Sequence, residues 1–186
     1  RANTATLVSD TSVPGANAQQ PTLAVGGRAR ALLQFELARS SSGLRLDRAI
    51  LKLFASEVAR PGAITVGAAS AAWDEARVTE ANAPAFDTRS AATANVVGAF
   101  RAVAIDVTAI VQGWISRPAS NFGFVVASAA GATTDARFDS QENTATSQPA
   151  VLELYWVSGA TTSSGTGSVG PAGPQGPPGP AGPQGP

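Results

Sequence analysis

The segment Ala29–Leu37, with the sequence ARALLQFEL, alternates between apolar and polar residues. In an extended chain its apolar side chains share one face: Ala31, Leu33, Phe35 and Leu37. Arg30, Gln34 and Glu36 are among the residues of the opposite face. A period of two residues is the pattern of a β-strand that packs one face against a hydrophobic core. We therefore expect a fold built from β-strands.

Much of residues 1–157 repeats this strand pattern. Ala49–Ala55 (AILKLFA) places Leu51 and Leu53 on one face, and its other face is only half polar, so we expect that face to be partly covered. Glycine and proline turns separate further short strands, which we expect at residues 5–9, 22–25, 63–68, 100–106, 123–128, 136–140 and 150–157.

One short helix is expected at Val107–Ile115. Its apolar residues recur at the spacing of one helix face: Val107, Ile110, Val111 and Trp114. Asp106 or Thr108 can cap its first turn. Many short strands with a single helix predict an all-β fold, a two-sheet antiparallel β-sandwich of the jelly-roll type.

Composition divides the chain into three zones. Residues 1–157 form the expected globular head, residues 158–169 are rich in Ser, Thr and Gly and predict a linker, and residues 170–186 follow a triplet rule. Glycine occupies every third position of this last zone: Gly170, Gly173, Gly176, Gly179, Gly182 and Gly185. Only glycine fits at the axis where three polyproline II strands coil together, so the zone predicts a collagen-like segment.

A collagen-like strand works only as one of three, so we expect the chain to associate with itself as a homotrimer. Six triplets are marginal on their own, which leaves two explanations open. Either the head itself trimerises, or the natural collagen-like segment continues past Pro186. Arg1 is not a natural start, so we expect a longer, secreted protein whose signal peptide is absent here, located outside the cell or on its surface.

The charge and composition exclude several classes of function. The chain has 13 basic and 13 acidic residues and no basic stripe, so we expect neither a nucleic-acid partner nor binding to an anionic membrane. No apolar run approaches the roughly 20 residues that a membrane span needs, so we expect no membrane insertion. Because the chain lacks Cys and His, it has no thiol nucleophile, no imidazole base and none of the usual zinc ligands.

Carboxylates are the remaining candidates for acid–base chemistry. Asp74 with Glu75, and Asp139 with Glu142, are the nearest pairs, but such pairs on the loops of a β-sandwich are usually solvated. We therefore expect no enzyme activity and no cofactor. Calcium is the metal that the composition leaves open, since it is bound by oxygen atoms, although no D-x-D-x-D run occurs and we assign no ligands.

Six segments, taken in order, resemble one family. ARALLQFEL is similar to the family's R-x-LLxFDL strand, and RAILKLF (48–54) is similar to xAxLxLY. Four further motifs match WDEARVTEANAP (73–84), IDVTAIVQGW (105–114), NFGFV (121–125) and the closing strand of residues 137–154. Together they resemble the DNRLRE domain, a β-sandwich of carbohydrate-binding-module type found in bacterial extracellular proteins. Glu80 departs from the family pattern, which commonly has tryptophan there.

The residues of these motifs have structural explanations. We expect Trp73 and Trp114 to pack in the core or between the sheets, and Asn121 to form a tight turn. The motif residues that we expect to hold the fold are Trp73, Thr79, Pro84, Asp106, Thr108, Trp114, Asn121, Gly123 and Ser140. Two other aromatic residues are the candidates to face a ligand: Phe122 and Trp156.

Two functions fit these observations. The leading hypothesis is a non-enzymatic structural head of a bacterial collagen-like surface protein, which helps three chains meet in register, caps the triple helix and acts in adhesion. The alternative is a carbohydrate-binding module displayed multivalently on a collagen-like stalk, with a polysaccharide or a host surface ligand as its partner. The sequence does not separate a cell-surface protein from a phage or spore appendage.

Overall fold

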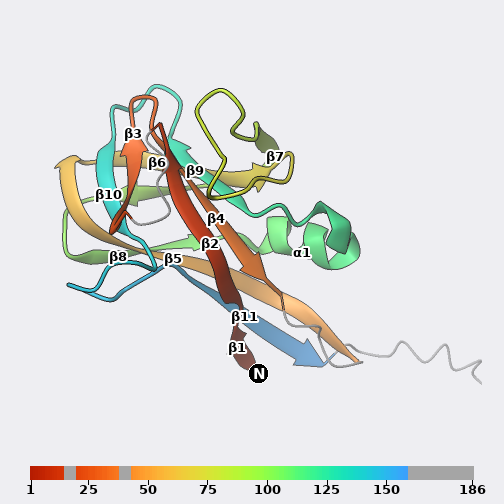
Figure 1. Cartoon of the computed structure of the whole chain (residues 1–186). Coiled ribbons are helices and arrows are strands. Elements are labelled where there is room, and N and C mark those ends of the chain that lie inside the picture. The colour runs from red at the N-terminus through yellow and green to blue at the C-terminus, as the bar shows by residue number, and fades with distance from the viewer. Residues whose placement is uncertain (15–19, 38–42, 159–186) are drawn as a thin grey trace, which may run out of the picture.

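Two antiparallel β-sheets pack face to face in the computed structural model, which describes residues 1–14, 20–37 and 43–158 (Figure 1). The first sheet has six strands in the order β1-β11-β5-β10-β3, with β8 also paired to β5. The second sheet has five strands in the order β2-β4-β9-β6-β7. This arrangement is a mostly β fold with two antiparallel sheets, as the sequence predicts.

The elements have the following bounds. The strands of the first sheet are β1 (Ala2–Thr4), β3 (Thr22–Gly26), β5 (Leu44–Arg60), β8 (Arg101–Asp106), β10 (Asp135–Asp139) and β11 (Val151–Ser158). The strands of the second sheet are β2 (Thr6–Val13), β4 (Arg30–Glu36), β6 (Gly62–Ala69), β7 (Phe86–Val96) and β9 (Phe124–Ser128). The helix is α1 (Thr108–Ser116), and a 3-10 turn, η1 (Pro118–Ser120), follows it.

The core lies between the two sheets and is supplied by the alternating strands. Ala31, Leu33 and Phe35 of β4 are buried there opposite Leu51 and Leu53 of β5, which confirms the faces that the alternation predicts. The outer face of β5 is partly covered, because its outward side chains are only half-buried: Ile50, Lys52 and Phe54. Both observations follow from the two-residue period of an extended chain.

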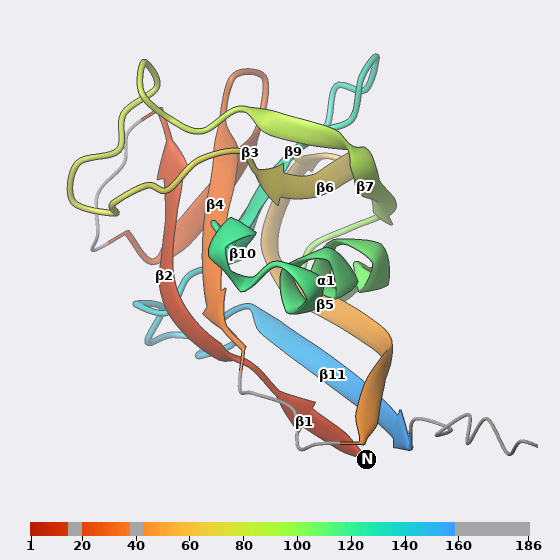
Figure 2. The same ribbon diagram turned by 90° about the vertical axis from the view of Figure 1, so that its right-hand side faces the viewer.

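The helix α1 fills the open edge between the two sheets (Figure 2). Its buried face consists of Ile110, Val111 and Trp114, and the Trp114 ring lies 4.6 Å from the ring of Phe124 on β9. The N-cap residue is Val107, which makes no side-chain cap, so neither Asp106 nor Thr108 caps the helix as the sequence predicts. Asp106 lies one residue earlier, and its carboxylate accepts the Thr108 N–H at 3.0 Å. The helix begins one residue later and ends one residue later than the sequence predicts.

The structure contains two strands that the sequence pattern does not predict, and two other strands are longer than predicted. β1 and β7 escaped notice because both are edge strands, and β7 (FDTRSAATANV) is rich in alanine and polar residues. The expected strand at residues 5–9 in fact continues to Val13 through the polar residues SDTS of β2. β5 extends far beyond residues 49–55, since β11, β8 and β10 pair with successive parts of it.

Ser158 is the last residue of β11 and the last that the structure describes. The rest of the expected linker (158–169) and the collagen-like triplets from Gly170 to Gly185 lie outside the described residues. Among the helices of the described part, neither length nor apolar character suffices for a membrane crossing.

Candidate functional site

Most of the motif residues hold loops against the sandwich. The Trp73 indole N–H donates to the Phe122 carbonyl at 2.9 Å, and its ring packs on a small apolar cluster that includes Leu32 of β4. Asn82 accepts the Thr79 N–H at 2.6 Å, which closes the turn before the buried Pro84. These contacts fix the segment between β6 and β7 on the outside of the second sheet.

Three further motif residues fix the loops around β9 and β10. The Asn121 amide donates to the Phe35 carbonyl at 2.9 Å, and its oxygen accepts the Gly123 N–H at 3.3 Å. Ser140 donates to the Gln20 carbonyl at 2.5 Å and accepts the Glu142 N–H at 3.2 Å. Each side chain thus bonds to backbone groups of another segment or of its own turn, as short polar side chains in tight turns do.

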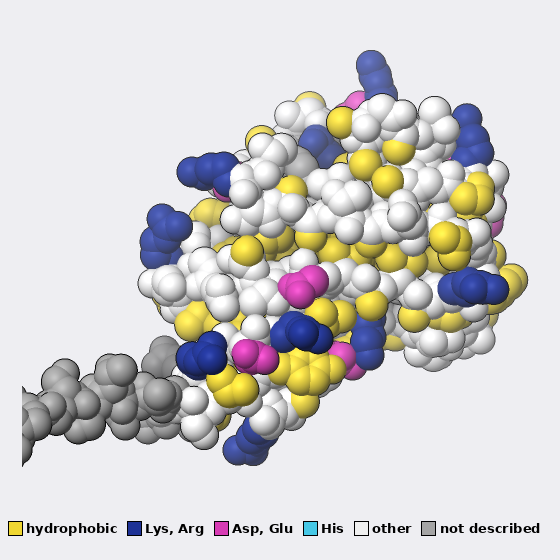
Figure 3. All heavy atoms as spheres, turned by 180° about the vertical axis from the view of Figure 1, so that it is seen from behind, with side chains coloured by type: hydrophobic (Ala, Val, Ile, Leu, Met, Phe, Trp, Pro, Cys, Tyr) yellow, Lys and Arg dark blue, Asp and Glu magenta, His cyan; other side chains and the backbone are white. Residues whose placement is uncertain are grey.

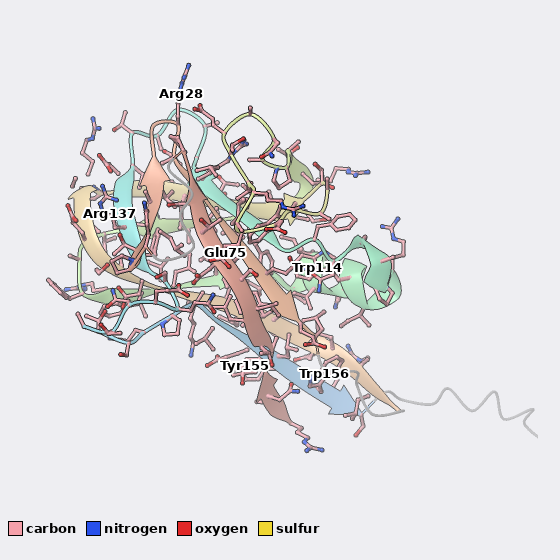
Figure 4. The ribbon with its side chains drawn as sticks, in the orientation of Figure 1. Arg28, Glu75, Trp114, Arg137, Tyr155 and Trp156 are labelled. Carbon is pink, nitrogen blue, oxygen red and sulfur yellow. The ribbon has the colours of Figure 1, made fainter. Side chains whose placement is uncertain are left out.

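A cleft of about 650 Å³ opens where β2, β4, α1 and β11 meet. Its lining residues are Val8, Gln34, Phe35, Glu36, Leu37, Trp114, Ile115, Pro118, Asn121 and Trp156. Trp114 projects from α1 and Trp156 from β11 (Figure 4). The volume is that of a small-molecule site, and an apolar lining with a few polar groups is typical of one.

The two tryptophans line this cleft but are almost fully buried. Trp114 is 3% exposed and Trp156 is 6% exposed, and the Trp156 indole N–H donates to Asn3 Oδ1 at 2.8 Å. The exposed apolar surface comes instead from Val8 and Ile115, which are 50% and 39% exposed. The apolar surface that a ligand would meet in this cleft is therefore mainly aliphatic.

Three polar side chains line the same cleft. The Asn121 amide is occupied by its bonds to Phe35 and Gly123. Gln34 and Glu36, on β4, form no side-chain hydrogen bond or ion pair with the part of the chain that the structure describes. Both are therefore available to a ligand. The alternating pattern predicts that both side chains lie on the polar face of their strand. It does not indicate that a cleft lies beside them.

The two aromatic candidates for ligand contact lie in different clefts. Trp156 belongs to the large cleft, whereas Phe122 lines a smaller one of about 270 Å³ on the other side of Trp114. This smaller cleft also contains Arg89, whose guanidinium bonds Asp87 at 2.9 Å, and Arg117, which forms no ion pair with a described residue. The structure therefore does not unite Phe122 and Trp156 in one platform.

The outer face of the first sheet carries a mixed polar network. The Lys52 ammonium lies 2.5 Å from Glu153 Oε1, and the Tyr155 hydroxyl donates to Glu153 Oε2 at 2.8 Å. The hydrogen bond from Lys52 lowers the pKa of Glu153. Acidic, basic and hydrophobic side chains are interspersed on the face seen from behind (Figure 3). Glu153 thus binds Lys52 and Tyr155 together on this face.

The structure does not form the carboxylate pairs that the sequence suggests, Asp74 with Glu75 and Asp139 with Glu142. Asp74 accepts the Ala76 N–H at 2.9 Å, and Asp139 accepts the Asn143 amide at 3.0 Å, so each stabilises its own turn. Glu75 and Glu142 instead converge on Asp10 of β2. The structure thus joins Glu75 and Glu142 to Asp10 and separates them from the partners that the sequence suggested.

A β-sandwich with an open, largely apolar cleft and free polar groups is an arrangement that a binding module can use. A family model described as carbohydrate-binding module family 96 matches residues 2–154. The chain therefore belongs to carbohydrate-binding module family 96. A search of curated proteins found no match. Domains of such families are binding modules and not catalytic ones, which is consistent with the expectation of no enzyme activity.

Proposed function

We propose that this chain binds a glycan in the cleft between β4, α1 and β11. One observation carries the proposal: a match to a carbohydrate-binding family coincides with a cleft of about 650 Å³ that offers two unpaired polar side chains. The family match favours the second of the two hypotheses from the sequence, because it concerns sugar recognition. The collagen-like context that motivated the first hypothesis lies outside the described residues.

The lining suggests how a sugar would be held. The C–H face of a pyranose ring would lie on Val8, Ile115 and the edge of Trp156, while Gln34 and Glu36 would bond its hydroxyl groups. Glu36 is the charged residue among the described lining residues, and its carboxylate would repel a polyanion. The cleft is therefore suited to neutral or amino sugars and less suited to uronate polymers.

Calorimetric titration with three oligosaccharide probes tests the proposal: a neutral β-glucan, a chito-oligosaccharide and an alginate oligosaccharide. Ile115→Ala and Glu36→Ala remove exposed side chains, so both variants should fold. Each should weaken binding of the neutral or amino sugar about tenfold, which corresponds to about 1.4 kcal/mol. Tyr155→Ala, on the outer face of the first sheet, is the matched control and should bind as the unaltered chain does.

Two results would contradict this assignment. Loss of binding in Tyr155→Ala, with binding retained in Ile115→Ala and Glu36→Ala, would move the site to the outer face of the first sheet. Absence of binding by the unaltered chain at millimolar concentrations of every probe would remove the glycan function itself.

We propose further that this module stands at the head of a collagen-like stalk. The support is the unbroken glycine period from Gly170 to Gly185, which favours a homotrimer with residues 1–157 as its head and 158–169 as its linker. On this proposal the resemblance to the DNRLRE domain describes the head, and the whole protein acts outside the cell or at its surface. Three heads on one stalk would bind a polysaccharide with avidity, which joins the two hypotheses in one mechanism.

A further inference from the structure

Three carboxylates from distant parts of the sequence converge at one point beside β2. Asp10 lies within β2, Glu75 in the segment between β6 and β7, and Glu142 in the loop between β10 and β11. One oxygen from each lies within 4.8 Å of the other two. Glu75 lies beside β2 (Figure 4), and the loop between β10 and β11 is tied to this strand by the hydrogen bond from the Gln141 N–H to Asp10.

The centre of the cluster contains carboxylate oxygens that lack partners. Asp10 is 2% exposed, and although its Oδ2 accepts the Gln141 N–H at 2.8 Å, its Oδ1 has no hydrogen-bond partner in the described part of the chain. The buried Oε1 of Glu75 also lacks one there. A buried oxygen without a partner costs free energy, so a native protein normally satisfies such a group with another atom or ion.

The charge of the cluster is also uncompensated. None of the ion pairs in the described residues involves these three carboxylates. Burial raises the pKa of Asp10 to about 7, the Gln141 N–H opposes this effect, and the charges of Glu142 and Glu75 add to it. Burial likewise raises the pKa of Glu75, and Glu142 adds to it, while a hydrogen bond from Ser9 lowers it. The geometry alone indicates a cation site, since three carboxylates converge here, one is buried with an unpartnered oxygen, and none has a positive partner among the described residues.

We propose that Asp10, Glu75 and Glu142 bind a calcium ion. The donors are all carboxylate oxygens, which suit a hard cation, and the chain has no Cys or His that would favour zinc or copper. Two oxygens on opposite sides of a calcium ion, each about 2.4 Å from it, lie about 4.8 Å apart. The spacing of the three oxygens therefore permits one ion to contact all of them.

The loop that supplies Glu142 is held in place independently of any ion. Ser140 bonds the Gln20 carbonyl, and Asp139 accepts hydrogen bonds from both Asn143 and Thr146. The Gln141 N–H then ties the loop directly to Asp10. A site that is preformed in this way binds a metal without a large cost in ordering. The bound ion would join β2 to two distant loops. Glu75 follows Asp10 by 65 residues in the sequence, and Glu142 follows Glu75 by 67.

The site goes beyond sugar binding and does not depend on it. Its role would be to fix the segment between β6 and β7, which carries Trp73, against the second sheet. A ligand that binds only the folded protein stabilises it in proportion to the logarithm of its concentration. Calcium should therefore raise the melting temperature of the chain whether or not a glycan is present.

The test uses the full chain after treatment with a chelator, with calcium chloride alone as the probe. Calorimetric titration should show one calcium ion per chain, and thermal unfolding should show a higher melting temperature with calcium than without it. Magnesium chloride should have a weaker effect, since magnesium demands near-ideal octahedral geometry and dehydrates reluctantly. Glu75→Gln and Glu142→Gln should weaken calcium binding by at least about tenfold.

Asp10→Asn separates loss of the site from loss of the fold. Its amide oxygen can still accept the Gln141 N–H, and removal of one negative charge should raise the melting temperature without calcium while abolishing the calcium-dependent rise. Asp47→Asn, an exposed carboxylate on β5, is the matched control and should respond to calcium as the unaltered chain does. The proposal is overturned if the chelator-treated chain shows neither heat nor a melting shift with millimolar calcium, or if all three cluster variants respond normally.

Discussion

Gly123 shows how strongly a single backbone position is constrained in this fold. It sits at the start of β9 with a φ of 86°, in the left-handed region that side chains disfavour. A Cβ added there would overlap the Leu33 carbonyl oxygen and approach the backbone of Gln34 on β4. Because β4 and β9 are paired at this point, neither strand can retreat without losing hydrogen bonds of the second sheet.

We expect Gly123→Ala to destabilise the protein by about 2–4 kcal/mol, since it combines an unfavourable φ with a backbone overlap. Gly113→Ala is the matched control, because Gly113 lies in α1 and a Cβ there meets nothing within 4 Å. That substitution should stabilise the protein by roughly 0.5–1 kcal/mol, since alanine favours a helix. Urea unfolding of both variants measures the two changes, and equal effects of the same sign would contradict this account.

At the residue scale, the structure groups the carboxylates differently from the pairs that the sequence suggests. Asp10, Glu75 and Glu142 are 65 and 67 residues apart in sequence, so no local spacing connects them. Only the pairing of β2 within its sheet, and the folding of two loops over it, brings them together. Gln34 and Glu36 illustrate the same point, because their strand pattern is visible in the sequence whereas the cleft beside them is not.

At the scale of the element, α1 is joined to the first sheet through its first turn. Asp106 accepts hydrogen bonds from the Thr108 N–H and hydroxyl at 3.0 and 2.6 Å, and the Thr108 hydroxyl oxygen accepts the Ala49 N–H at 2.9 Å. The end of β8 thus positions the helix that carries Trp114 into the cleft. The side-chain hydrogen bond from Thr108 lowers the pKa of Asp106 from its ordinary value of 3.8.

Asp106→Ala should therefore cost about 1 kcal/mol at neutral pH, the usual net contribution of a hydrogen bond. A carboxylate whose pKa is lowered in the folded state contributes stability above its unfolded pKa and loses it as the pH falls through the folded pKa. The difference between the variant and the unaltered chain should therefore shrink as the pH falls below 3.8. Chemical unfolding at pH 7 and in acid measures it, with Asp47→Ala as an exposed control. If the difference in unfolding free energy between Asp106→Ala and the unaltered chain persists unchanged in acid, the ionised Asp106 carboxylate does not supply this stability.

The extra length of β5 and the presence of β7 also belong to this scale. The polar residues in the outer parts of β5 interrupt the apolar alternation, but β11 and β10 pair with them and continue the strand. β7 consists largely of small and polar residues, and its pairing with β6 holds it extended. Local propensity for strand is a weak signal, and such pairing overrides it.

At the scale of the whole molecule, the question is whether one head or three act together. If residues 170–186 assemble as a triple helix, three glycan clefts share one particle, and binding to an immobilised polysaccharide gains from the high local concentration of sites. A soluble oligosaccharide that fills one cleft gains nothing from this arrangement. The comparison of the two ligands therefore reports on assembly.

We expect the full chain to sediment as a trimer in the cold and to bind an immobilised polysaccharide roughly 10²-fold more tightly than the matching oligosaccharide. Gly176→Ala places a side chain at the crowded axis and should return the chain to a monomer and abolish the difference. Ala172→Ser, at a position away from the axis, is the control and should preserve both. A monomeric unaltered chain would contradict assembly through these triplets, and a Gly176→Ala trimer would assign assembly to the head.

The sequence by itself determined the class of fold and most of its strands. The two-residue period of β4 and the centre of β5 is local information, since it depends only on which face of an extended chain meets the core. The apolar spacing of α1 is local in the same sense. Only the tertiary structure decided where the cleft lies and which carboxylates meet. Both sites combine side chains from separate strands and loops, and the distance between such residues is set by the packing of the sheets and not by their separation along the chain.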